Sequence, residues 1–165
     1  MTPQKKIKKT VIITGYKCNN NCRFCMEADK RSFPTRTTIE TEQEMFNARK
    51  RGSDYLELIG GEMTIRSDIV RLIKSAKKLG FSTIMMATNG RMYSYLKLTE
   101  AILEAGLTSL VFSIHGHTAK LHDWLTRVPG SFDELKQGVK NVQKVSKKLG
   151  LTASNELYDY LYEFN

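Results

Sequence analysis

The stretch TVIITGYKCNNNCRFC, residues 10–25, joins a β-branched run to three closely spaced cysteines. Residues 10–14 predict a short buried strand, because β-branched residues favour the pleated conformation. The cysteines follow with the spacing CxxxCxxC, at Cys18, Cys22 and Cys25. Iron–sulfur clusters, zinc and copper(I) all prefer thiolate ligands. The stretch therefore predicts a metal-binding loop at the carboxyl end of the first strand.

Strand and helix patterns alternate along the rest of the chain. Short apolar runs bounded by glycine or asparagine predict further strands at 55–59, 81–87 and 107–114. Helical patterns, each ending at a glycine, run from Thr41 to Gly52, Ser67 to Gly80, Met92 to Gly106 and Ser131 to Gly150. Capping-box pairs, Thr41 with Glu44 and Ser131 with Glu134, open the first and the last of these helices. Four βα units in series predict an α/β fold with a parallel sheet covered by helices.

Small or polar motifs come directly after all four predicted strands. They are the cysteines, Gly60-Gly61-Glu62, Thr88-Asn89-Gly90 and Ser113. Because the carboxyl ends of parallel strands meet at one rim, these motifs are expected to converge on one site. Periodicity alone does not separate a closed barrel from an open sheet, since both wind right-handed through βα units.

The overall composition is that of one globular domain with a positive charge. The chain has 165 residues, 41% of them hydrophobic, and 26 basic against 17 acidic residues give a net charge of +9. Residues 1–9 are predicted to be a basic tail and residues 10–165 the folded core. The sequence has no membrane span and no signal-peptide pattern, so a cytoplasmic protein is expected. The excess of lysine is compatible with an anionic partner, such as RNA. The sequence has no aromatic RNA-binding motif that would favour RNA.

Three interpretations of the cysteines compete. A zinc site needs a fourth ligand, which His115 or His117 would have to supply. Cysteines at this spacing could instead share the buried face of a helix, but the three intervening asparagines favour turns. A four-iron, four-sulfur cluster held by three cysteines would keep one iron open for another ligand.

The cysteine motif, with Phe24 before its last cysteine and Gly60-Gly61-Glu62 after the second strand, resembles that of the radical S-adenosylmethionine superfamily. The resemblance implies a partial (β/α) barrel of the radical SAM type, with a 4Fe-4S cluster on Cys18, Cys22 and Cys25. It implies that S-adenosylmethionine is cleaved reductively to methionine and a 5′-deoxyadenosyl radical. That radical would take hydrogen from an unidentified substrate, peptide or nucleotide-like, and a flavodoxin or ferredoxin would supply the electron.

The same resemblance assigns residues to S-adenosylmethionine. Phe24 would offer a backbone contact to the adenine, and Gly60, Gly61 and Glu62 would hold the methionine amino group. The remaining cofactor residues would be Thr88, Asn89, Ser113 and Arg127. Each of these four also has an ordinary structural explanation, as a turn residue, a locally bonded hydroxyl or a solvated arginine. His115, His117 and His122 could face the substrate, or they could simply be loop residues.

The resemblance runs from about residue 10 to residue 150, where a short Tyr-rich helix over 155–165 takes the place of further βα units. A shortened core would leave the edge of the fourth strand exposed. We expect that helix, a second copy of the chain or a partner protein to cover the edge. The alternative function is a truncated iron–sulfur binding or electron-transfer protein without catalysis.

Overall fold

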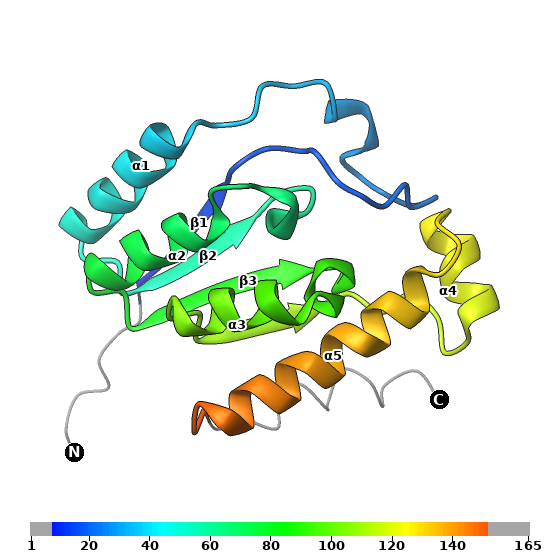
Figure 1. The fold of residues 1–165 in the computed structure, drawn as a ribbon. Helices are drawn as coiled ribbons and strands as arrows, with labels where there is room; N and C mark the ends of the chain where they lie inside the picture. Colours follow the sequence, from blue (N-terminus) through cyan, green and yellow to red (C-terminus); the bar gives the residue numbers. More distant parts are fainter. Residues whose placement is uncertain (1–7, 152–165) are drawn as a thin grey trace, which may run out of the picture.

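Four strands alternate with helices in the computed structural model, which describes residues 8–151 (Figure 1). The strands are β1 (Lys9–Ile13), β2 (Tyr55–Ile59), β3 (Thr83–Thr88) and β4 (Ser109–Phe112). They pair in the order β1-β2-β3-β4, and every pair is parallel. The predicted α/β fold with four βα units is therefore confirmed. Phe81 and Leu107, which the apolar pattern assigned to strands, lie just before β3 and β4 and are buried in the core.

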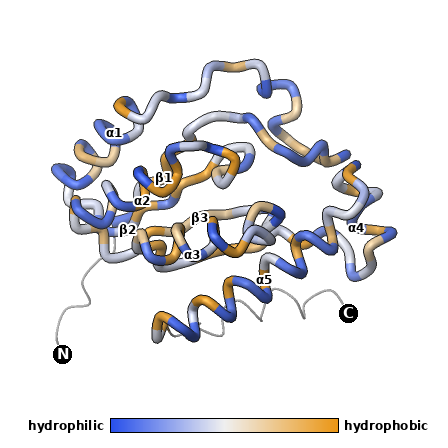
Figure 2. Tube along the Cα trace, viewed as in Figure 1, coloured by the Kyte–Doolittle hydropathy of each residue, from blue (hydrophilic) through white to orange (hydrophobic). Residues whose placement is uncertain are grey.

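The helices follow the strands, and all but one lie side by side over one face of the sheet (Figure 1). The α-helices are α1 (Thr38–Lys50), α2 (Ile69–Lys78), α3 (Leu96–Glu104), α4 (Ala119–Thr126) and α5 (Ser131–Lys148). The exception, α4, lies beyond the carboxyl ends of the strands and packs against the helix that follows it. Short 3-10 helices are η1 (Ala28–Lys30), η2 (Met63–Ile65) and η3 (Arg91–Ser94). Hydrophobic and hydrophilic residues alternate along α5 at helical spacing, which gives it one apolar face (Figure 2). Within the described residues no helix is long and apolar enough to cross a membrane.

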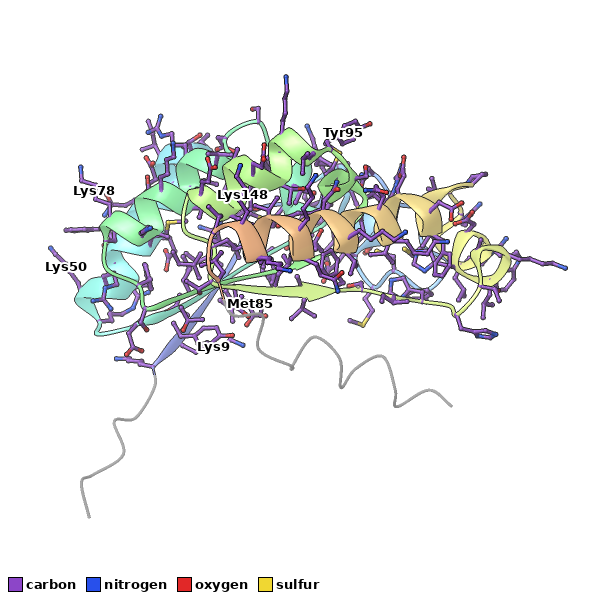
Figure 3. All side chains as sticks on the ribbon, turned by 60° about the horizontal axis from the view of Figure 1, so that its bottom comes forward. Lys9, Lys50, Lys78, Met85, Tyr95 and Lys148 are labelled. Atoms are coloured by element: carbon purple, nitrogen blue, oxygen red, sulfur yellow. The ribbon has the colours of Figure 1, made fainter. Side chains whose placement is uncertain are left out.

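The two faces of the sheet differ in burial. Ile12, Leu58 and Leu110 point into the core beneath the helices and are buried. Their strand neighbours Val11 and Val111 are 47% and 44% exposed, and in Figure 3 no described helix covers that second face. Parallel sheets usually have both faces covered. The predicted helix over 155–165 lies outside the described residues, and a cover for the β4 edge stays a prediction.

The first helix begins one turn earlier than predicted. Its capping box is formed by Thr37 and Glu40: the Glu40 amide donates to Thr37 Oγ1 over 3.2 Å, and the Thr37 amide donates to Glu40 Oε2 over 2.7 Å. Thr41, the predicted cap, is buried inside the helix and donates its hydroxyl to the Thr37 carbonyl. The sequence contains two Thr-x-x-Glu pairs in succession, and the first of them starts the helix.

The helix predicted over 92–105 is divided. It begins as η3, is interrupted at Tyr95, whose backbone is extended, and continues as α3. The carbonyls of Tyr93 and Ser94 accept hydrogen bonds from Asn141 Nδ2 on α5, at 2.9 and 2.8 Å. Because α5 supplies these partners, the carbonyls do not need intrahelical ones.

The end of the chain differs from prediction at α4 and at the start of α5. Helix α4 was not predicted, although Thr118 caps it by accepting from the Leu121 amide. His122, for which the sequence left substrate contact or a loop position open, lies on this helix. The predicted Ser131–Glu134 capping box is wrong. Asp123 of α4 does the capping instead, because its carboxylate accepts from the Gly130 and Phe132 amides at 2.7 and 2.9 Å. Two consecutive helices are thereby joined by one side chain.

Candidate functional site

The three cysteines lie in a loop of consecutive turns after β1. The Cys25 amide donates to the Cys22 carbonyl and the Ala28 amide to the Cys25 carbonyl, each over 3.3 Å. The cysteines therefore do not share a helix face, and that interpretation is wrong. All three are free thiols and all are half-buried. We call residues 15–27 the cysteine loop.

The start of the cysteine loop is fixed by the Gly60-Gly61-Glu62 turn that follows β2. The Gly61 amide donates to the Gly15 carbonyl and the Glu62 amide to the Lys17 carbonyl, both over 2.9 Å. A Cβ atom on Gly61 would lie 2.2 Å from the Lys17 carbonyl oxygen. The glycine is therefore required for close backbone approach to the cysteine loop itself.

The middle of the cysteine loop is held by the carboxyl end of α4. The amides of Asn21 and Arg23 donate to the carbonyls of Thr126 and Leu125, at 3.0 and 2.9 Å. Arg23 Nε also donates to the Trp124 carbonyl, and its guanidinium stacks 4.3 Å from the centre of the Trp124 ring. The last carbonyls of a helix lack intrahelical partners, so the cysteine loop completes the hydrogen bonding of α4.

Glu62 is buried, with 3% of its surface exposed, and four donors from its own chain surround its carboxylate. The amide and hydroxyl of Thr64 and the hydroxyl of Thr88 donate to Oε1, at 3.1, 2.6 and 2.8 Å. The amide of Asn89 donates to Oε2 over 2.7 Å. A carboxylate offers about four acceptor sites. Because Thr88 and Asn89 stand at the end of β3, the hydrogen bonds to Glu62 connect the end of β2 to the end of β3.

Asn89 connects the end of β3 to the first cysteine. Its Nδ2 donates to Asn19 Oδ1 over 2.7 Å and lies 3.8 Å from Cys18 Sγ. The amide of Asn20 also donates to Cys18 Sγ, over 3.3 Å. Thr88 and Asn89 thus lie beside the cysteine loop as expected, with their side chains engaged by protein groups. Their contact with a cofactor stays a prediction.

Arg91 is a site residue that the sequence analysis missed. Its guanidinium donates to the Asn19 carbonyl and to Asn20 Oδ1, and it forms an ion pair with Glu134 of α5. It therefore braces the cysteine loop against a helix that is distant in the sequence. A basic residue directly after the Asn89-Gly90 turn was the available signal, but its partners depend on tertiary contacts.

The thiols fit a cluster better than a single ion. Burial raises the pKa of Cys18 and of Cys22, and the neighbouring cysteines raise that of Cys22 further. Among residues 8–151, no three side chains of Cys, His, Asp or Glu gather closely enough to ligate one metal ion. This argues against the zinc interpretation. A cubane cluster instead binds each thiolate at a different iron, so its cysteines do not have to converge on one point. Three half-buried cysteines in one loop meet that requirement.

Phe24 and the histidines form a stack beside the cysteine loop. The rings of Phe24 and His115 meet edge to face with centroids 4.7 Å apart, and His115 stacks on His122 at 5.8 Å. His122 is buried, and its Nδ1 accepts from the His115 amide over 3.2 Å. Phe24 and His115 are therefore brought together at the rim, which the sequence did not indicate.

Ser113 and Arg127 are placed differently with respect to the rim. Ser113 directly follows β4, and its amide donates to the Thr88 carbonyl over 2.8 Å, so it lies next to the end of β3. Arg127 is exposed at the carboxyl end of α4, with a left-handed backbone at φ 59°. The structure joins Ser113 to the other rim residues and gives Arg127 no side-chain partner among the described residues.

An open cavity of about 480 Å³ lies close to the glycine turn. Residues lining it include Thr14, Lys17, Glu62, Arg66 and Asp68, and none of the cysteines is among them. A cofactor that meets the thiols has to lie against the cysteine loop. We therefore place the candidate site at the rim between the loop, Gly61, Asn89 and Ser113.

Fold and site together define a protein of βα units with a three-cysteine loop after its first strand. The family model described as the Radical SAM superfamily matches residues 12–155. The chain belongs to this superfamily, and the resemblance stated from the sequence is confirmed.

Curated relatives of the chain are enzymes. A probable GTP 3′,8-cyclase of Saccharolobus solfataricus is 28% identical over 157 residues, which cover 93% of this chain and 50% of that protein. A 7,8-dihydro-6-hydroxymethylpterin dimethyltransferase of Methanocaldococcus jannaschii is 32% identical, over 68% of this chain and 24% of that protein. The chain thus spans half or less of the length of these relatives.

Solved structures share the fold. SuiB of Streptococcus suis, bound to its precursor peptide SuiA, superposes with a TM-score of 0.69 and 24% identity, over 83% of this chain and 30% of that one. Methylornithine synthase superposes with a TM-score of 0.63 and 18% identity, over 83% and 41% of the two chains. At these identities the likeness supports the fold alone.

Proposed function

We propose that this chain is the core of a radical S-adenosylmethionine enzyme. The observation that carries the proposal is the cysteine loop, held at its start and at its middle so that its cysteines lie beside the ends of β2 and β3. When bound, a 4Fe-4S cluster and S-adenosylmethionine supply an electron and a cleavable sulfonium, which yield methionine and a 5′-deoxyadenosyl radical.

The protein's own residues would bind and orient these groups. The three thiolates would hold the cluster. The backbone carbonyls of Gly60 and Gly61 and the Glu62 carboxylate would meet the methionine amino group, since Glu62 Oε2 accepts a single hydrogen bond from the described residues, that of the Asn89 amide. Ser113 has a hydroxyl with no protein partner among residues 8–151, which leaves it available for the ribose or the carboxylate of the cofactor.

The substrate class follows from relatives rather than from the site. The curated relatives carry names of enzymes for a guanine nucleotide and for a pterin, and the SuiB structure contains a precursor peptide. We propose a nucleotide-like or peptide substrate that approaches the uncovered face of the sheet. A small redox protein, a flavodoxin or ferredoxin, would provide the electron.

The test is anaerobic reconstitution with iron and sulfide, followed by dithionite and S-adenosylmethionine, with chromatography for 5′-deoxyadenosine. We expect the wild type to bind about four irons and to release 5′-deoxyadenosine. Cys22→Ser should lose both, and Ser32→Ala, at an exposed position beyond the cysteine loop, should lose neither. Cluster formation without any 5′-deoxyadenosine would favour the alternative, an iron–sulfur binding or electron-transfer protein.

A further inference from the structure

We propose that Asn89 is a positioning residue that raises the reduction potential of the bound cluster through a hydrogen bond to the Cys18 sulfur. This inference rests on the proposed function, because it needs the cluster on the three cysteines. It gives Asn89 a role that is separate from contact with S-adenosylmethionine.

The hydrogen bonds to the three sulfurs are unequal. Cys18 Sγ receives the Asn20 amide at 3.3 Å and Asn89 Nδ2 at 3.8 Å. Within residues 8–151, no side chain donates a hydrogen bond to the sulfur of Cys22 or Cys25. Asn89 is also the donor that comes from outside the cysteine loop, since it follows β3. The structure therefore singles out the sulfur of Cys18 for a hydrogen bond from the end of β3.

The Asn89 amide is fixed in orientation. Its Oδ1 accepts from the Arg91 amide at 3.1 Å, and its Nδ2 donates to Asn19 Oδ1 at 2.7 Å. Its own backbone amide is held by Glu62, and the side chain is buried. With Oδ1 committed as an acceptor, Nδ2 has to face Asn19 and Cys18. The donor is thus in place before the cluster binds.

The chemical consequence follows from the charge on the sulfur. A donor to a cysteine that ligates a cluster withdraws electron density, so the reduced and more negative cluster is stabilised. Removal of the Asn89 donor should lower the potential, which makes the cluster harder to reduce. An anionic oxygen at the same position should lower it further, because it repels the added electron.

The experiment is a potentiometric titration of the reconstituted holoprotein, followed by electron paramagnetic resonance of the reduced cluster. Asn89→Leu removes the donor at similar volume, and Asn89→Asp retains Oδ1 for the Arg91 amide while replacing Nδ2 by an oxygen. Asn21→Leu and Asn21→Asp are matched controls in the cysteine loop, because Asn21 is exposed and only its backbone is engaged.

We expect the ratio of reduced to oxidised cluster at a fixed potential to fall about fivefold in Asn89→Leu and about tenfold in Asn89→Asp. A tenfold change in that ratio equals about 59 mV for one electron. Neither Asn21 variant should shift the ratio by as much as twofold.

Equal shifts in the Asn89 and Asn21 pairs would overturn the inference, and so would unchanged potentials. Loss of the cluster from both Asn89 variants but not from the Asn21 pair would also overturn it, because Asn89 would then hold the loop rather than tune the metal. Failure of the wild type to bind iron would instead be a failure of the proposed function.

Discussion

Glu62 is a buried carboxylate whose charge is satisfied by hydrogen bonds rather than by a cation. In the described part of the chain no basic side chain pairs with it, and Thr64, Thr88 and Asn89 supply all its donors. Hydrogen bonds to a charged acceptor are stronger than neutral ones, and unpaired donors in a buried place are costly. The residue is therefore as important for stability as for any ligand.

Glu62→Gln should destabilise the fold by about 3 kcal/mol, because an amide places two N–H groups where donors already converge. Urea denaturation of the apoprotein measures this as a lower midpoint at an unchanged slope. Glu104→Gln, at an exposed position on α3, should change the free energy of unfolding by less than about 0.5 kcal/mol. Equal effects of the two substitutions would contradict a structural role for Glu62.

Arg127 is the one residue other than glycine among those described that has a positive φ. A left-handed backbone costs a residue with a Cβ atom about 1 kcal/mol. Arg127→Gly should therefore be about 1 kcal/mol more stable than Arg127→Ala, which removes the same side chain and keeps the strain. Thermal unfolding of both variants measures the difference. If Arg127 also contacts the cofactor carboxylate, both should lose affinity for S-adenosylmethionine equally in a binding titration.

Among single residues, the candidate cofactor ligands were predicted from the sequence better than the residues that fix the cysteine loop in place. The cysteine spacing and the Gly60-Gly61-Glu62 motif are local patterns. Arg91 was missed because its partners, Asn19, Asn20 and Glu134, come from segments far apart in the sequence. The hydrogen bonds that Thr88 and Asn89 donate to Glu62 could not be predicted for the same reason.

Among the elements, α4 and α5 act as one unit through Asp123. Burial alone would raise the pKa of Asp123, but hydrogen bonds from the Phe132 and Gly130 amides and the Ser131 hydroxyl outweigh burial and lower it. The carboxylate thus replaces a capping side chain on α5 itself. Since α4 also holds the cysteine loop, this contact indirectly positions the thiols.

Asp123→Ala should cost about 1–2 kcal/mol, the usual loss on removal of a helix cap. Its matched control is Asp133→Ala, which removes an exposed carboxylate from the first turn of α5 and a surface ion pair with Lys136. Surface pairs of this kind contribute less than about 1 kcal/mol. Urea denaturation above pH 5 compares the two, and a smaller effect at Asp123 than at Asp133 would contradict the assignment.

Strands and helices were predicted well where one hydrophobic periodicity runs through the whole element. They were predicted poorly where a residue far away in the sequence hydrogen-bonds to their ends. The strands and α2 follow from apolar patterning. The interruption at Tyr95 depends on Asn141, 46 positions later by residue number, and the start of α5 depends on Asp123 of the preceding helix. Helix ends were thus wrong where their caps came from elsewhere.

The whole molecule should lose stability in mild acid because of the buried His122 and the half-buried His115. Burial lowers the pKa of His115 and of His122, and the proximity of His122 lowers that of His115 further. In the unfolded chain both imidazoles have their ordinary pKa near 6.5. The unfolded state therefore binds more protons below about pH 6.5, and stability falls as the pH decreases from there to the folded-state pKa.

His122→Asn should flatten this pH dependence, because Asn keeps an acceptor for the His115 amide and does not titrate. Urea denaturation at several pH values between 7.5 and 5 measures the slope, which should decrease by at most about 1.4 kcal/mol per pH unit. His117→Asn, at an exposed position, should leave the slope as in the wild type. Carboxylates such as Asp123, with a lowered pKa, affect stability only below this range.

The docking of the cysteine loop on α4 also orders events during synthesis of the chain. The amides of Asn21 and Arg23 find their acceptors at Leu125 and Thr126, which the ribosome adds about a hundred residues later. A nascent chain that has emerged only as far as β3 therefore holds the start of the cysteine loop at the glycine turn but lacks the acceptors for the middle of the loop. The segment from Asn21 to Arg23 can therefore reach its final position only after α4 has been translated.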